Sequence, residues 1–269
     1  MSRSNRRANR GLEWGVALLL SELYRTGYDV IPPVTLATVV GQILLYIGVI
    51  NVPWTQSEVC LSAAHVLKGK DYRRLLWSTF EHGDDMHLYY NMISFMVKGR
   101  TLEGRYGSAN FGFLLAFLCA LTSCSYVVLA LIGAQIMDDP YIMKSCAIGF
   151  SGVLFALKVV TTQEDPRGYS NVAGFWVPVK YAAWAELLAI NMLVPNSSFL
   201  GHLAGIVAGL IYTKTFIGHL VDNIIRNITG KFSFFPTSNF GGVIIGRPQF
   251  TRSTFNRLIL WSLKGFKLN

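Results

Sequence analysis

A serine and a histidine lie where two apolar stretches of this chain begin, and both residue types can take part in catalysis. Ser151 lies within a Gly-Phe-Ser-Gly sequence at positions 149–152, and His202 opens a second run that is rich in small residues. A serine hydroxyl becomes a useful nucleophile near neutral pH when a base such as histidine removes its proton. The two residues could therefore catalyse acyl transfer if the fold brings them together.

A second polar pair, His87 and Asn91, is separated by four positions, which places both side chains on one face of a helix. Histidine and asparagine side chains can donate hydrogen bonds to the oxyanion that forms during acyl transfer. Each candidate also has a structural interpretation. Ser151 could be a small residue that eases helix packing, and the other three side chains could form hydrogen bonds between helices.

Glycines accompany both apolar stretches. Gly149 and Gly152 flank Ser151, and we expect them to leave room for the backbone of a polypeptide substrate. A stripe of glycines recurs at every fourth position beside the histidine: Gly201, Gly205 and Gly209. Such a stripe lets one helix backbone approach another closely. The helix that carries His202 should therefore press against a neighbour, and its imidazole can reach Ser151 if that neighbour carries the serine.

The composition favours a membrane protein. Hydrophobic residues make up 52% of the 269 residues, charged residues make up 14%, and the mean hydropathy is +0.39, whereas soluble domains carry about 25% charged residues. The net charge of +9 does not indicate nucleic-acid binding, because the basic residues flank apolar runs and form no block with interleaved aromatic residues. We predict an all-α, polytopic membrane protein embedded in the lipid bilayer.

No metal or cofactor is expected. The four cysteines show no spacing typical of a metal site. Cys119 and Cys124 lie within an apolar run and are interpreted as packing residues. Cys60 and Cys146 fall in loops predicted on the same side of the membrane, which permits a disulfide without requiring one.

Six membrane spans can be drawn from the hydropathy pattern. They cover about 34–50, 86–100, 111–133, 150–161, 172–194 and 199–218. The third span has no charged residue and is long enough to cross a bilayer. The fifth contains Lys180 and Glu186, and Glu186 is expected to pair with Lys180 or to face the bundle interior. Glu103 and Arg105 border a turn after the second span and are interpreted as structural.

Basic residues orient these spans. If the N-terminus is cytosolic, most lysines and arginines lie on the cytosolic side, in agreement with the positive-inside rule. Spans two, four and six then begin on the opposite side, so His87, Ser151 and His202 lie at one depth. The loop at 51–85 is on that side as well, and its aromatic and aliphatic residues predict short helices at the membrane interface.

We divide the chain into three parts. These are a cytosolic N-terminal segment at 1–33, a six-span domain at 34–219 and a basic cytosolic tail at 220–269. In the first part, a short helix near 14–20 is expected to lie in the membrane interface. In the tail, we expect 227–230 to be irregular and 254–269 to form a basic amphipathic surface helix.

Taken together, these motifs resemble the rhomboid intramembrane serine proteases. That family has His-x-x-x-Asn in the second span, Gly-x-Ser-Gly at the fourth and a histidine before Gly-x-x-x-Gly in the sixth. This chain matches all three motifs in order and spacing. It also has the upstream histidine of the family, His82, and a Glu-x-x-x-Gly sequence from Glu103 to Gly107. The resemblance covers about 32–218.

The resemblance implies a six-helix rhomboid bundle with an interfacial first loop and a catalytic dyad of Ser151 and His202. It implies that His87, Asn91 and the Ser151 backbone N–H stabilise the oxyanion. The implied substrates are single-pass transmembrane proteins whose helices are weakened. The family members that this chain resembles most imply a location in the endoplasmic reticulum membrane and a role in membrane-protein quality control.

Two features depart from the family pattern. Many members have a Trp-Arg pair in the first loop, where this chain has Arg73 and Arg74, so the arginine is kept and the tryptophan is lost. Mammalian relatives carry a long cytosolic tail that binds ubiquitin and the valosin-containing ATPase. Here the tail is short and basic and lacks those motifs, which puts binding of either partner in doubt.

Two other functions compete with proteolysis. A non-proteolytic membrane adaptor in membrane-protein degradation is the main alternative, but such relatives lose the serine or the histidine and this chain keeps both. A transporter would predict repeated halves and helix breaks at the bilayer midplane, which the sequence does not show.

Overall fold

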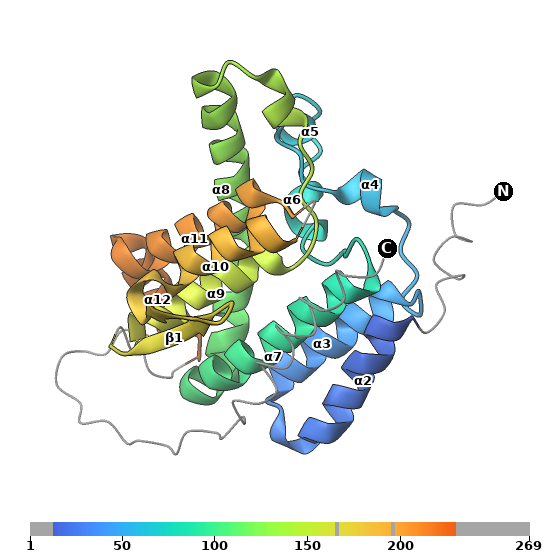
Figure 1. Cartoon of the computed structure of the whole chain (residues 1–269), viewed down its shortest axis with the longest axis vertical. Helices are drawn as coiled ribbons and strands as arrows, with labels where there is room; N and C mark the ends of the chain where they lie inside the picture. The colour runs from blue at the N-terminus through green and yellow to red at the C-terminus, as the bar shows by residue number, and fades with distance from the viewer. Residues whose placement is uncertain (1–12, 165–166, 195–196, 230–269) are drawn as a thin grey trace.

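Helix α8 (Ser108–Ile136) is the longest element of the structure, and most of the other helices pack around it (Figure 1). The computed structural model describes residues 13–164, 167–194 and 197–229. The 29 residues of α8 measure about 44 Å, more than the roughly 30 Å hydrocarbon core of a bilayer. Within the described residues, α8 alone is long and apolar enough to cross a membrane, and the bent pair Phe199–Lys214 and Phe216–Thr229 adds a second candidate if it counts as one span.

Five further helices complete the bundle. They are α3 (Pro33–Tyr46), α7 (Asp85–Tyr106), α9 (Ser151–Glu164), α10 (Ala182–Leu193) and α11 (Phe199–Lys214). Each overlaps one of the predicted spans. Helix α9 packs against α7, α8 and α11, and α10 covers α9 and α11. The mostly helical bundle is confirmed, but several of these helices are shorter than a bilayer is thick, so their lengths do not establish a count of six spans.

The main hydrophobic core lies between α3, α7, α8 and α9. On α7, the buried residues Leu88, Met92 and Phe95 recur three or four positions apart and form one apolar face. They pack with buried residues of the neighbouring helices: Val39, Phe111, Leu114, Leu118, Val153, Leu157 and Val160. This core fixes α7 beside α9, the two helices that carry the candidate residues Asn91 and Ser151.

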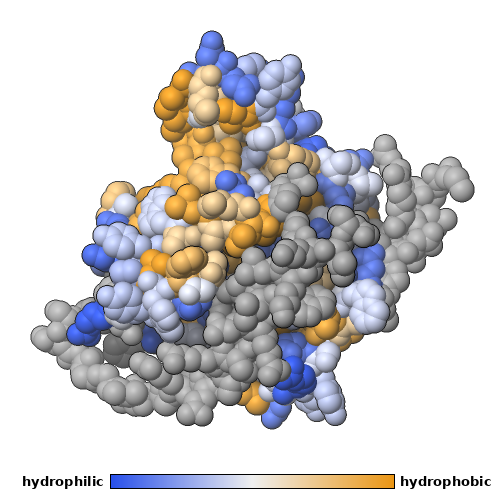
Figure 2. All heavy atoms as spheres, viewed as in Figure 1, coloured by the Kyte–Doolittle hydropathy of each residue, from blue (hydrophilic) through white to orange (hydrophobic). Residues whose placement is uncertain are grey.

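The first loop contains three short helices, as predicted. They are α4 (Gln56–Val59), α5 (Ala63–Leu67) and α6 (Arg74–Trp77). Helices α5 and α6, with the 3₁₀ helix η2 (Pro140–Lys144), pack against the part of α8 that extends beyond the rest of the bundle (Figure 1). Figure 2 shows apolar side chains over this part of α8. The loop therefore forms a cap over one end of the bundle.

The predicted fifth span is wrong in its first half. Residues Tyr169–Val172 (β1) and Phe175–Pro178 (β2) form an antiparallel hairpin in which Val172 pairs with Phe175. Its two turn residues, Ala173 and Gly174, both have positive φ values of 50° and 93°, as a two-residue hairpin turn requires. A single 3₁₀ turn, η3 (Val179–Tyr181), then leads into α10.

The N-terminal helix is α2 (Trp14–Thr26), and the 3₁₀ turn η1 (Tyr28–Val30) follows it. The position of α2 differs from that of the interfacial helix expected here. The helix runs alongside α7 (Figure 1) and buries Val16, Leu19 and Leu23. The Gly15 N–H donates to the Asp85 carboxylate at 2.6 Å, at the start of α7. Helix α2 therefore begins at the end of the bundle near His87. The expected cytosolic placement of 1–33 would instead put its start at the other end, where α11 terminates.

The chain after α11 also differs from the prediction. A 14-residue helix, α12 (Phe216–Thr229), turns by 73° from α11 and includes residues that were expected to be irregular. Its Thr229 hydroxyl donates to the Asn110 side-chain oxygen at 2.7 Å, so α12 reaches the first turn of α8. The expected surface helix at 254–269 lies outside the described residues.

Two acidic residues of the spans have structural partners. Glu103 is buried and accepts hydrogen bonds from the Val34 N–H at 2.8 Å and from the Thr35 N–H at 2.7 Å, which caps the start of α3. Its structural interpretation is confirmed. Glu186 pairs with Lys158 of α9 at 3.0 Å, so its partner is not Lys180. This ion pair joins α10 to α9.

Candidate active site

The structure brings Ser151 and His202 together, although 51 positions separate them in the sequence. Ser151 begins α9, and His202 lies in the first turn of α11. The Ser151 Oγ is 3.0 Å from the His202 Nε2, a hydrogen-bond distance. His202 is 5% exposed, and its ring packs on Phe155 with 4.8 Å between centroids. Its Nδ1 has no hydrogen-bond partner in the part of the chain that the structure describes, so the pair is a dyad there.

Close packing of α11 on α9 creates this contact. A methyl group on Gly205 would overlap the Gly152 carbonyl oxygen, and one on Gly209 would lie 2.6 Å from the Val159 Cβ. The prediction that the histidine helix presses closely against a neighbour is confirmed, and the structure shows that this neighbour is the serine helix. Gly152 itself lies against α11 and against Thr122 of α8, so the structure gives it a packing role.

His87 and Asn91 border the backbone just before Ser151. A Cβ atom on Gly149 would lie 2.8 Å from the His87 Nε2 and 3.6 Å from the Asn91 Nδ2. Gly149 has a φ of +110°, which residues with a side chain rarely adopt. The Asn91 Nδ2 is buried and has no acceptor among the described residues. Its N–H groups can therefore donate to an oxyanion formed beside Ser151.

His82 lies behind the site and is 1% exposed. Its ring meets the edge of His87 with 5.1 Å between centroids, and its Nε2 is 3.5 Å from the backbone nitrogen of Phe150. The Gln56 side chain donates to the His82 carbonyl oxygen. His82 therefore connects the first loop to the residue before Ser151 and acts as a positioning residue.

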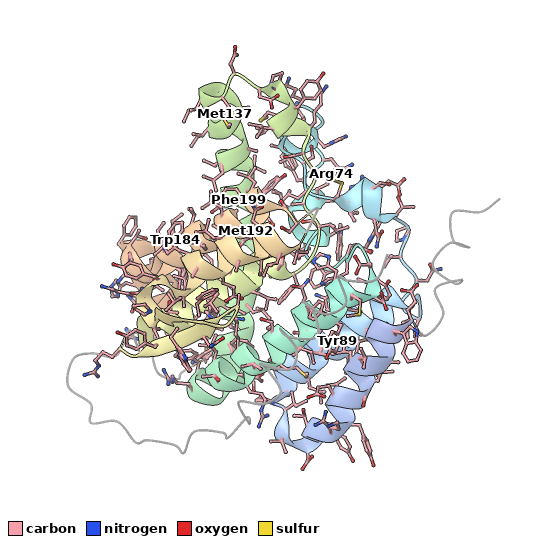
Figure 3. The ribbon with its side chains drawn as sticks, in the orientation of Figure 1. Arg74, Tyr89, Met137, Trp184, Met192 and Phe199 are labelled. Atoms are coloured by element: carbon pink, nitrogen blue, oxygen red, sulfur yellow. A yellow bond between two sulfur atoms is a disulfide. The ribbon has the colours of Figure 1, made fainter. Side chains whose placement is uncertain are left out.

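The first loop is joined covalently to the segment that leads into α9. Cys60 and Cys146 form a disulfide with their Cα atoms 5.6 Å apart, which answers the question that the sequence left open. The Arg74 guanidinium (Figure 3) is buried and donates to the Cys60 carbonyl oxygen at 2.7 Å and to the Asp71 carboxylate at 3.1 Å. Arg73 hydrogen-bonds the same carboxylate and holds the pKa of Asp71 below its ordinary value. Arg74, the arginine kept in this loop, therefore supports the disulfide.

Backbone hydrogen bonds reinforce the same connection. Leu61 and Ala147 exchange two N–H to carbonyl hydrogen bonds of 2.8 and 2.9 Å, and the Gly149 N–H donates to the Ser78 carbonyl oxygen at 2.9 Å. The sequence alone gave no signal for these contacts, because a bridge between two loops has no periodic pattern. They hold the residues before Ser151 in place.

A cavity of about 30 Å³ lies beside Ser151 on the side of α8. Besides Ser151, six residues that carry a hydroxyl group are among those that line it: Ser78, Thr79, Thr122, Ser123, Tyr126 and Ser198. The hydroxyls of Ser78, Thr122 and Ser123 are buried and have no hydrogen-bond partner among the described residues. Polar cavities of this size can hold a water molecule. Sequence reasoning missed Thr122 and Ser123, although two adjacent polar residues in an uncharged span are the signal that could have found them.

The fold and the site define a helical bundle with a part-buried serine–histidine pair at one of its ends. In the described part of the chain, no three His, Cys, Asp or Glu residues are placed to bind a metal ion. The site contains a potential nucleophile, Ser151, a potential base, His202, and a hydrogen-bond donor, Asn91.

The chain belongs to the rhomboid family, since the model of the Rhomboid domain matches residues 69–219. It is 43% identical over 217 residues to Rhomboid-related protein 4 of Mus musculus, and the matched region covers 80% of this chain and 68% of that protein. It is 45% identical over 208 residues to Rhomboid-related protein 4 of Homo sapiens, which covers 77% of this chain and 65% of that protein. A more distant relative, Rhomboid-type serine protease 2 of Eremothecium gossypii, is 27% identical over 191 residues, or 70% of this chain and 69% of that protein. Membership of this family makes the chain an integral membrane protein.

Proposed function

We propose that this protein is a serine endopeptidase that cleaves single-pass transmembrane proteins inside the membrane. The observation that carries the proposal is the 3.0 Å contact between the Ser151 Oγ and the His202 Nε2. The contact occurs in a rhomboid bundle in which Asn91 also presents a buried donor without an acceptor among the described residues. The name of the Eremothecium gossypii relative, a rhomboid-type serine protease, supports the same activity.

The proposed reaction follows from these positions. His202 accepts the Ser151 proton through Nε2 while the Ser151 Oγ attacks the scissile carbonyl carbon. The carbonyl oxygen becomes an oxyanion, and Asn91, His87 and the Ser151 backbone N–H stabilise it. His202 then gives its proton to the leaving amine, so the peptide bond breaks and an acyl ester remains on Ser151.

Water completes the reaction. A water molecule in the hydroxyl-lined cavity would lose a proton to His202 and attack the ester carbon, which releases the new carboxylate and restores the Ser151 hydroxyl. The hydroxyls of Thr122 and Ser123 can hold such a water molecule, because they are buried beside Ser151 and lack a protein partner among the described residues.

The proposed substrate class follows from backbone hydrogen bonding. In a lipid environment, a helix satisfies its carbonyl groups internally, so a stable transmembrane helix offers no carbonyl to Ser151. A substrate must unwind locally before it is attacked. Transmembrane segments with helix-weakening residues, such as those of misassembled membrane proteins, should therefore be preferred.

We further propose that the site faces the lumen of the endoplasmic reticulum. Disulfides form in oxidising compartments, and the Cys60–Cys146 bond lies at the end of the bundle that holds Ser151. The opposite ends of the helices carry Arg25, Arg100, Arg105, Arg167, Lys180 and Lys214. The basic residues at the end that holds Ser151 are offset by acidic residues of the same loops: Glu58, Asp71, Glu81, Asp84, Asp85, Asp138 and Asp139 stand beside Lys68, Lys70, Arg73, Arg74 and Lys144. This distribution fits a cytosolic location for the end of α11. A tag on the C-terminus should be digested by protease added to sealed microsomes, and its protection would contradict this orientation.

The activity can be tested with purified protein in liposomes and a labelled single-pass substrate. The wild-type chain should cut the substrate, and Ser151→Ala and His202→Ala should each abolish cutting. Ser170→Ala, which removes a hydroxyl from the remote strand β1, is the matched control and should cut normally. Equal cutting by all variants would disprove the dyad, and a wild-type chain that binds but never cuts a range of single-pass proteins would favour the adaptor function.

A further inference from the structure

The helix α12 has an apolar stripe that no described part of the protein covers. Phe216, Leu220, Ile224 and Ile228 recur every four positions and are 75%, 53%, 49% and 61% exposed. Positions four apart lie within about 40° of one another around a helix, so the four side chains form one continuous ridge. A ridge of this kind on a water-exposed surface would be costly.

The opposite side of α12 is fixed to the bundle. Asp222 and Ile225 are buried, and the Tyr212 hydroxyl of α11 donates to the Asp222 carboxylate at 2.8 Å. At the far end of the helix, the Thr229 hydroxyl bonds Asn110 of α8 at 2.7 Å. Because the helix is held at its middle and at its far end, it cannot easily rotate to hide its apolar stripe.

A third sector of α12 is polar. His219, Asn223, Arg226 and Asn227 are exposed. Around the helix, Asn223 and Asn227 flank the stripe, and His219 and Arg226 lie farther from it. The acidic residue of the helix, Asp222, is turned inward, so the charge that α12 presents outward is the positive charge of Arg226. Lys214, which is exposed at the end of α11, adds to it. The exposed surface of α12 therefore combines an apolar ridge with a polar sector of positive charge, a pattern that suits a bilayer with anionic head groups.

The position of α12 also favours contact with a lipid bilayer. The helix starts 14 residues beyond His202, about 21 Å along the bundle, and reaches the first turn of α8. It therefore lies at the end opposite the site, and its 73° turn from α11 directs it across the bundle and not along it. The β1–β2 hairpin, which joins the end of α9 to the start of α10, lies at the same end and exposes Tyr169, Phe175 and Trp176. Aromatic residues of this kind are enriched at membrane interfaces.

We propose that α12 is an interfacial helix that inserts its Phe216–Ile228 stripe into the lipid leaflet on the side opposite the active site. The polar sector then faces water, and the buried sector stays on α11 and α8. The partner is the bilayer itself, through acyl chains under the stripe and phosphate groups beside Arg226. This proposal does not depend on the protease activity.

Spin labels can test the depth of each sector in the full chain reconstituted in liposomes of phosphatidylcholine and phosphatidylserine. The free cysteines Cys119 and Cys124 are first replaced by alanine, and the Cys60–Cys146 disulfide is kept. Labels are then placed by Leu220→Cys and Ile224→Cys on the stripe and by Asn223→Cys on the polar sector as the matched control. Oxygen, which concentrates in the bilayer, and a water-soluble nickel chelate report the surroundings of each label.

Labels at 220 and 224 should be relaxed more by oxygen than by nickel, and the label at 223 should show the reverse. Equal access of nickel to all three labels would overturn the proposal, because the stripe would then face water. Labels at 220 and 224 that are reached by neither agent would also overturn it, because protein would then cover the stripe. Phe216→Cys and Ile228→Cys, on the same stripe, repeat the test if either first variant fails to fold.

Discussion

Replacing Gly205 with alanine should separate the catalytic pair without touching either member of it. The added methyl group would lie 2.8 Å from the Gly152 carbonyl carbon and 2.9 Å from the Phe155 Cβ, whereas carbon atoms pack at about 3.5–4.0 Å. The methyl group would also overlap the Gly152 carbonyl oxygen, so helices α9 and α11 must move apart by at least about 1 Å. The 3.0 Å separation of the Ser151 Oγ and the His202 Nε2 would grow to about 4 Å, beyond the range of a hydrogen bond.

A displacement of about 1 Å from the productive geometry can cost about 10²-fold in rate. We therefore expect Gly205→Ala to lower kcat about 100-fold with little change in KM, and to destabilise the fold by about 1–3 kcal/mol through overpacking. The assay measures cleavage of a labelled single-pass substrate in liposomes, with reaction of Ser151 with a fluorophosphonate probe as a second readout. The matched control is Gly41→Ala in α3, where an added methyl group meets no atom within 4 Å.

The control should keep the wild-type rate in both assays. A folded Gly205→Ala protein that cleaves substrate and reacts with the probe at the wild-type rate would refute the reasoning, because the dyad would then not depend on the closeness of the two helices.

Three further changes probe other parts of the structure. Asn91→Ala should lower kcat by about 10²–10³-fold, as loss of an oxyanion donor does, while thermal unfolding shifts little; an unchanged kcat would remove Asn91 from the mechanism. Glu103→Gln should destabilise the protein by about 1–3 kcal/mol, because the cap on α3 loses its charge, and a melting temperature equal to that of the wild type would contradict this role. Replacing Cys60 and Cys146 with serine opens a loop of 86 residues and should lower the free energy of unfolding by up to about 4 kcal/mol. The measurement is a lower melting temperature under non-reducing conditions. An unchanged melting temperature would show that the backbone contacts alone hold the loop in place.

The candidate dyad could be predicted from the sequence because two independent patterns agree. The predicted spans alternate in direction, so Ser151 and His202, at the starts of the fourth and sixth, are expected at one depth. The glycine stripe then predicts which helix surface makes close contact, and Gly205 does meet Gly152. Neither pattern refers to loops, which is why the connection between Leu61 and Ala147 was not predicted.

The errors in the predicted elements have physical reasons. Val172 and the apolar residues of β2 continue the hydropathy of the fifth span, so a window average does not register the reversal at Ala173 and Gly174. The turn there lacks the Asn-Gly or Asp-Gly pair that marks most such hairpins. Helix α12 was missed because its mean hydropathy is modest, although apolar residues at every fourth position from Phe216 were a readable signal.

The placement of α2 could not be read from its composition. Its apolar face is compatible with a membrane surface and with the side of another helix, and the contact between Gly15 and Asp85 joins positions with no local relation in the sequence. Charge patterns predict a direction for the spans, but they do not show which helix an amphipathic segment packs against.

The Cys60–Cys146 bond has a consequence for how the chain folds as it is synthesised. A ribosome adds residues from the N-terminus onward, so the thiol of Cys60 has no partner until 86 more residues have been synthesised. The newly made chain must therefore wait for its second thiol and for an oxidant before the peptide leading to Ser151 is covalently tethered. Helices α3, α7 and α8 are therefore complete before the covalent support of the nucleophile can form.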